Sequence, residues 1–209
     1  TWPPNTDVTN PAAWSPSQAG SLPPLASDAN LLPYGDLEGI STGNGSAIVP
    51  FPGWANGGTL TVVPWGSAGG FPAATDPGPA DRGLNFIAGG PGAAQSIATT
   101  TVILPVSAQK IDSGAMTAEL SAWLGGFGSQ DDAASLSASF LDASGITLGT
   151  MTLGPVLGAD RNNVTGLIYR SAVMTVPTGA RSAVARLEMN RQSGSYNDAY
   201  ADDLSLVLH

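Results

Sequence analysis

The sequence predicts an all-β fold, an antiparallel β-sandwich. From Asn30 onward, short apolar or alternating runs are separated by Gly, Pro, Asn and Asp, which is typical of strands joined by turns. No run of about 12 or more residues carries a helical hydrophobic period with capping residues. About ten such runs follow one another at short spacing, which indicates a sandwich rather than a parallel α/β sheet.

The individual strands follow from these runs in chain order. Residues 129–143 are helix-like in composition, but Leu136, Ala138 and Phe140 alternate with serines, and this period of two predicts a strand. The other runs are bounded by Gly, Pro, Asn or Asp on at least one side. We expect strands over 31–38, 46–52, 59–65, 83–88, 95–104, 115–124, 134–141, 146–152, 166–176, 181–190 and 201–208.

The alternation also assigns side chains to faces, because successive residues of a strand point to opposite sides of a sheet. In two of the strands the apolar members should face the core: Ala118, Leu120, Ala122, Leu124, Ala183, Ala185, Leu187 and Met189. The residues of the other parity in these two strands, together with Arg170 of the 166–176 strand, are expected on an outward sheet face. They are Glu119, Trp123, Arg170, Arg186, Glu188 and Asn190. Carboxylate, guanidinium, amide and indole groups of this kind hold sugars, so these six residues are the candidate ligand site.

Composition excludes several functions. The 7 basic and 16 acidic residues among 209 give a net charge of −9, which argues against binding to nucleic acids and anionic membranes, because both select basic patches. Cysteine is absent, which removes disulfides, thiolate metal sites and cysteine nucleophiles. The single histidine, His209, is the last residue, which argues against imidazole-based catalytic triads and His-rich metal sites.

The surface and the N-terminal end point to an exported protein. Only 11% of the residues are charged, as in exported proteins that meet polymers, although a compositional bias of the genome explains this equally well. No apolar run approaches the roughly 20 residues of a membrane span, and no signal-peptide pattern opens the chain, so we expect a secreted protein whose signal peptide has been removed. Residues 1–27 predict a proline-rich extension or linker before a sandwich module over 28–209, with Trp2 and Trp14 either packed on the module or part of a ligand surface.

The two ends of the predicted module resemble a known family. The run Asn30-Leu-Leu-Pro-Tyr-Gly-Asp-Leu-Glu38 resembles the opening N-L-x-x-x-G-x-x-E of galactose-binding-like jelly-roll modules. The run Tyr200-Ala-Asp-Asp-Leu-Ser-Leu-Val-Leu208 resembles their last strand, in which two acids precede alternating apolar residues. These modules include secreted carbohydrate-binding domains and the sugar-binding F-box-associated domain. The resemblance implies a jelly roll whose first and last strands are adjacent.

The resemblance also implies a structural Ca²⁺ ion. If the ends meet, Glu38 lies near Asp202 and Asp203, and carboxylates with loop carbonyls form the oxygen-only environment that calcium prefers. The alternative is that these acids cap a turn or are solvated. The spacing is not that of an EF-hand loop.

A second candidate ligand site lies at the loop tips. These polar side chains stand between strands, where binding residues are often placed: Asp131, Asp132, Arg161, Arg191, Tyr196 and Asn197. Ordinary turn chemistry explains Asn and Asp at such positions as well.

Two functions from different classes remain. The first is a non-catalytic polysaccharide-binding module, free-standing or tethered to other domains of a secreted protein. The second is a structural or adhesive spacer with no sugar site. A carboxylate-only glycosidase or lyase would need two acids about 5–10 Å apart, and Glu119 with Glu188 is the pair to examine.

Overall fold

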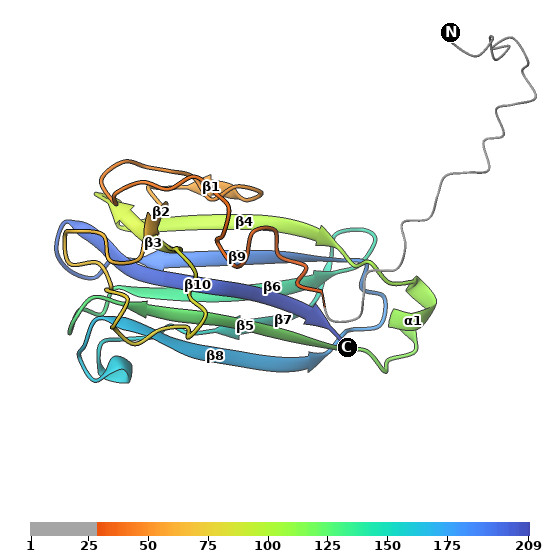
Figure 1. Cartoon of the computed structure of the whole chain (residues 1–209). Helices are drawn as coiled ribbons and strands as arrows, with labels where there is room; N and C mark the ends of the chain where they lie inside the picture. Colours follow the sequence, from red (N-terminus) through yellow and green to blue (C-terminus); the bar gives the residue numbers. More distant parts are fainter. Residues whose placement is uncertain (1–28) are drawn as a thin grey trace, which may run out of the picture.

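The computed structural model describes residues 29–209 as a sandwich of two antiparallel sheets (Figure 1). Sheet A has the strand order β1-β4-β9-β6-β7, and sheet B has the order β2-β3-β10-β5-β8. The strands are β1 (Ala55–Gly57), β2 (Thr61–Pro64), β3 (Asn85–Pro91), β4 (Gln95–Ile103), β5 (Thr117–Gly126), β6 (Ala133–Leu141), β7 (Thr147–Leu153), β8 (Gly166–Thr175), β9 (Ser182–Asn190) and β10 (Tyr196–Leu208). The helix α1 (Ala108–Asp112) and the 3-10 turn η2 (Ala159–Arg161) are short connections, and α1 lies at one end of the sandwich. The predicted antiparallel all-β sandwich is confirmed.

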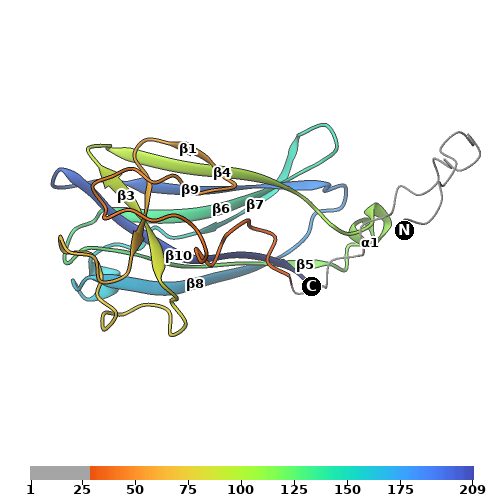
Figure 2. The ribbon, with the colours of Figure 1, turned by 45° about the horizontal axis from the view of Figure 1, so that its top comes forward.

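The core between the two sheets is built from the residues that the alternation assigns to it. On β5 and β9 the apolar members are fully buried and alternate with partly exposed polar ones. On β6, Leu136, Ala138 and Phe140 are completely buried, so the period of two correctly overrides the helix-like composition. Figure 2 shows the two layers closer to edge-on, with β4, β9 and β6 stacked over β10, β5 and β8.

The beginning and the end of the described chain lie side by side, as the end motifs predict. The backbone N–H of Leu31 donates to the carbonyl of Leu206 at 2.8 Å. The Asn30 side chain joins the same strand, because its amide donates to the Leu204 carbonyl and its oxygen accepts from the Leu206 N–H. The Leu204 N–H in turn donates to the Gly35 carbonyl. Asn30 and Gly35 of the opening motif therefore attach it to β10.

Two of the predicted strands are wrong. Residues 31–38 form turns, because Tyr34 and Leu37 adopt positive φ angles of 52° and 59° that no strand accommodates. Residues 46–52 are irregular: Pro50 and Pro52 have no N–H for a sheet ladder. The structure adds the short strand β1, which the sequence does not predict, and β10 begins five residues earlier than expected, at Tyr196.

A second, smaller apolar cluster lies on the outer face of sheet B. Val63, Phe86 and Tyr200 are fully buried there although they point away from the main core. The loop between β2 and β3 covers them with Trp65 and Phe71, and Arg82 holds this loop by donating to three of its carbonyls and stacking over Trp65 at 4.6 Å. This loop covers part of that face.

Within residues 29–209, no helix is long and apolar enough to cross a membrane. The predicted extension 1–27, with Trp2 and Trp14, lies outside the described residues. Its boundary with the module stays a prediction.

Candidate functional site

The six residues of the predicted ligand face do not share a face. Glu119 and Trp123 lie on β5 in sheet B, whereas Arg186, Glu188 and Asn190 lie on β9 in sheet A. Both groups point outward, so they occupy opposite outer surfaces of the sandwich. The prediction of one shared face is wrong, because alternation separates inside from outside but does not reveal to which sheet a strand belongs.

Arg170 is not on an outward face at all. It is the register partner of Ala122, which is completely buried, and its neighbours of the same parity, Ile168 and Ala172, pack against the core. Arg170 therefore leaves sheet B on the inner side, at the edge strand β8. A charge that points inward on an edge strand hinders the addition of a further strand. This protection is a structural explanation for an arginine at position 170.

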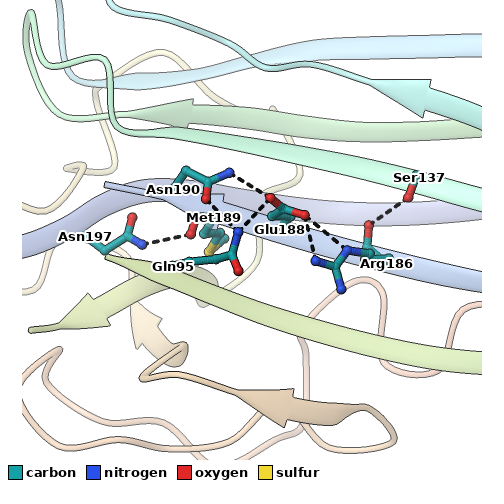
Figure 3. A network of polar contacts seen from close by, with 7 residues as sticks. All are labelled: Gln95, Ser137, Arg186, Glu188, Met189, Asn190 and Asn197. Carbon is teal, nitrogen blue, oxygen red and sulfur yellow. Dashed lines mark hydrogen bonds and ion pairs between the residues drawn. The ribbon is translucent and has the colours of Figure 1, made fainter. Parts of the chain in front are cut away.

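On sheet A, Glu188 is the centre of a polar network (Figure 3). One carboxylate oxygen accepts from the Gln95 amide at 2.9 Å and from the Asn190 amide at 3.0 Å. The other accepts from the Arg186 guanidinium at 2.8 and 3.1 Å. The Gln95 amide also donates to the Asn190 oxygen at 3.0 Å. Adjacent strands β4 and β9 thus present four polar side chains that hold one another in place.

These four side chains remain accessible. The side chains of Arg186 and Glu188 are 39% and 28% exposed, and Gln95 is exposed. The amide of Asn190, followed by the guanidinium of Arg186, lowers the pKa of the Glu188 carboxyl below its ordinary value of 4.5. Glu188 is therefore a carboxylate at neutral pH and presents hydrogen-bond acceptors, not a proton.

A depression adjoins this network. It has a volume of about 390 Å³ and is lined by Asp131, Ser135, Pro155, Leu157, Asn190 and Gln192, among others. Asn190 belongs both to the network and to the wall of the depression, so the two form one continuous surface of polar and apolar groups. We call this surface, made of Gln95, Arg186, Glu188, Asn190 and the depression, the sheet A site.

Most residues of the predicted loop-tip site are bonded to backbone groups and stabilise the fold. Asp132 is fully buried, and its carboxylate accepts from the backbone N–H groups of Gln192, Ser193 and Asp198. Asn197 is fully buried and donates to the Met189 carbonyl. Arg161 is 3% exposed and donates to four backbone carbonyls. These three are unavailable to a ligand because burial and backbone partners occupy them.

The remaining loop-tip residues differ in accessibility. The Tyr196 hydroxyl donates to the Gly45 carbonyl, and Arg191 donates to the Ser195 carbonyl. Asp131 is exposed, and one of its oxygens accepts from the Gly158 N–H while the residue lines the depression beside Asn190. Of the loop-tip set, Asp131 alone lines the sheet A site.

On the outer face of sheet B, Trp123 is half-buried. Its ring contacts the covered aromatic cluster on one side and Tyr169 of β8 on the other, with ring centroids 5.8 Å apart. Tyr169 is 46% exposed and is the residue that the sequence reasoning missed. Glu119 lies farther along β5, 3.7 Å from the His209 imidazole.

The predicted calcium ligands lie close to one another, and two of them already accept hydrogen bonds from the protein. Glu38 accepts from the N–H groups of Leu84 and Asn85, and Asp202 accepts from the Trp65 indole and the Asp203 N–H. Burial, together with the neighbouring Asp203 carboxylate, raises the pKa of Asp202 to about 8.

Burial also raises the pKa of Asp203, to about 6. Within the described residues, no three acidic or histidine side chains converge on a metal position. Calcium therefore stays a prediction from the resemblance.

The fold is found among solved structures. The enzymatically active domain of tailspike protein 4 of bacteriophage CBA120 matches 86% of this chain at 16% identity with a TM-score of 0.52, and this chain spans 21% of that protein. The carbohydrate-binding module TmCBM61, solved with β-1,4-galactotriose, matches 87% of this chain and 99% of its own length at 15% identity, with a TM-score of 0.47. A family 16 carbohydrate-binding module matches 75% of this chain and 91% of its own length at 19% identity, with a TM-score of 0.47. No protein-family model and no curated protein sequence matches the chain. At these identities the likeness concerns the fold alone.

Proposed function

We propose that this protein is a non-catalytic carbohydrate-binding module that holds a polysaccharide on the sheet A site. The observation that carries the proposal is the Glu188 network. A carboxylate, a guanidinium and two amides stand side by side on two adjacent strands, remain accessible, and are oriented by one another.

The chemistry of this network matches what sugar recognition requires. Hydroxyl groups are paired donors and acceptors, and carboxylate, amide and guanidinium groups bind them in bidentate fashion. Because Glu188 already fixes its neighbours, little side-chain conformational entropy is lost when a ligand binds. The depression beside Asn190, about 390 Å³, lies within the range of small-molecule sites, which run from about 300 to 1,000 Å³.

The same geometry favours binding without hydrolysis. Glu119 and Glu188 point away from each other on opposite outer faces, and packed sheets are about 10 Å apart, so this pair cannot act on one glycosidic bond. Glu188 also lacks the raised pKa of a general acid, because its neighbours stabilise the carboxylate. The proposed role needs only an acceptor.

Export and attachment to other domains complete the proposal. A sequence with 11% charged residues and many small polar ones suits an extracellular protein that meets polymers. The proline-rich residues 1–27 suit a spacer to a further domain.

Affinity electrophoresis tests the proposal. The full chain is run through native gels that contain soluble xylan, β-1,4-galactan, galactomannan or carboxymethyl cellulose, and at least one polymer should retard it. Glu188→Ala should then weaken binding by about 1.5–3 kcal/mol, the scale of hydrogen bonds to a charged group.

Asp112→Ala is the matched control, because the Arg181–Asp112 ion pair has the same 2.8 Å length on another part of the surface. It should bind like the wild type. Retardation by none of the four polymers would favour the spacer function, and equal binding by Glu188→Ala would move the site elsewhere.

A further inference from the structure

The opposite outer face carries a second set of accessible recognition groups. We infer that the module binds two glycan chains at once, one at the sheet A site and one at a sheet B site centred on Trp123 and Tyr169, and so bridges polysaccharide chains. This inference rests on the proposed function and extends it from holding a polymer to cross-linking it.

The sheet B site begins with an aromatic pair. Trp123 and Tyr169 are register partners on β5 and β8, and their rings lie 5.8 Å apart at 59°. The cluster behind Trp123 fixes its ring, while Tyr169 stays 46% exposed at the outer end of the pair. Rings held in this way offer an apolar surface to the C–H face of a sugar.

The polar atoms of these two rings have no protein partner within residues 29–209. Every other described tryptophan donates its indole N–H, Trp54 to the Pro33 carbonyl and Trp65 to Asn85 and Asp202. The hydroxyls of Tyr196 and Tyr200 are also bonded, to the Gly45 carbonyl and the Asp198 carboxylate. Buried aromatic donors normally find partners, and those that remain free at an accessible position are available to a ligand.

Hydroxyl and carboxylate groups continue the site along the same strands. Ser121 and Ser171 form the next register pair on the same side, and Glu119 with Val173 forms the one after it. Residues two apart on a strand are roughly 6.6–6.8 Å apart, so these rows extend over a length that suits a chain of sugar rings. A polymer can therefore contact the rings and the serine hydroxyls together.

The two sites cannot be filled by one short ligand. Trp123 and Glu188 project from opposite sheets of the sandwich and face away from each other. A polysaccharide chain on one face leaves the other face open to a second chain. Two independent sites on a single domain give cross-linking and a gain in avidity on a dense polymer.

A capture assay tests this inference. The monomeric state of the full chain is first checked by light scattering. Wild-type protein is then bound to a surface coated with each of the four polymers named above, excess protein is washed away, and the same polymer with a fluorescent label is added. The wild type should retain labelled polymer. Tyr169→Ala and Glu188→Ala should each still bind the surface but retain at least about tenfold less label, since each has lost one site.

Tyr34→Ala is the matched control, because Tyr34 is 51% exposed on another part of the surface, and it should retain label like the wild type. Trp123→Phe, which keeps one aromatic ring but loses the N–H and the second ring of the indole, should give an intermediate loss. A wild type that binds a polymer yet retains no labelled chain, or a Tyr169→Ala protein that retains as much as the wild type, overturns the second site alone. Binding to none of the polymers overturns the proposed function itself.

Discussion

Removal of the buried guanidinium should show that the loop tips are built for stability. In Arg161→Met the side chain stays long and apolar, but the carbonyls of Gly126, Gly128, Gln130 and Val164 lose their donor. The side chain is 3% exposed, so water cannot simply replace the guanidinium. Breaking a buried charged interaction typically costs about 3–5 kcal/mol, and each unsatisfied buried group costs about 1–3 kcal/mol.

We therefore expect Arg161→Met to lower the free energy of unfolding by about 3–5 kcal/mol, which for a domain of this size lowers the melting temperature by about 6–20 °C. Urea denaturation followed by tryptophan fluorescence measures the loss. Arg181→Met, which removes a side chain that is 34% exposed, should cost less than about 1 kcal/mol. A loss below about 1 kcal/mol in Arg161→Met would refute the view that this arginine holds the loops together.

Three further predictions follow from the site and the strands. Because its neighbours lower the pKa of Glu188, the carboxylate should stay charged as the pH falls through the ordinary pKa of 4.5, and the glycan binding that needs this charge should persist with it. Binding should be lost only when the pH falls through the lower pKa of Glu188 in the folded protein. A calorimetric titration that already shows half the affinity at pH 4.5 would contradict this. Arg170→Val should free the β8 edge and produce concentration-dependent oligomers by light scattering, whereas a variant that is monomeric at every concentration would remove the protective role of Arg170. If the resemblance correctly implies calcium, saturating Ca²⁺ should raise the melting temperature relative to chelator and Asp203→Asn should abolish the rise; an unchanged wild type would rule the site out.

The sequence predicts the core well because buried positions show in the alternation of apolar and polar residues within each strand. Alternation on β5, β6 and β9 marks the buried side of each strand within a few residues, and the structure confirms it. The same signal was present for Tyr169: in the β8 strand, Ile168, Ala172 and Met174 share one parity, which places Tyr169 outward and Arg170 inward.

The site was predicted less well because sheet membership is not local. Nothing within the β5 or β9 segments reveals that they belong to different sheets, since strand order depends on pairings between distant residues. Acidic residues in turns are misassigned from the sequence for a related reason. Asp132 looks like an accessible loop carboxylate in the sequence, but the fold brings three backbone N–H groups to it from residues 192–198.

The central claim, that the Glu188 network holds a glycan, is tested most directly by nuclear magnetic resonance. An oligosaccharide of whichever polymer binds is titrated into ¹⁵N-labelled protein while the side-chain signals of Gln95, Asn190 and Arg186 are followed. We predict that these three signals shift together and saturate with one dissociation constant, because all three groups bond to Glu188. Signals of these side chains that stay unchanged while others on the protein shift would contradict the account.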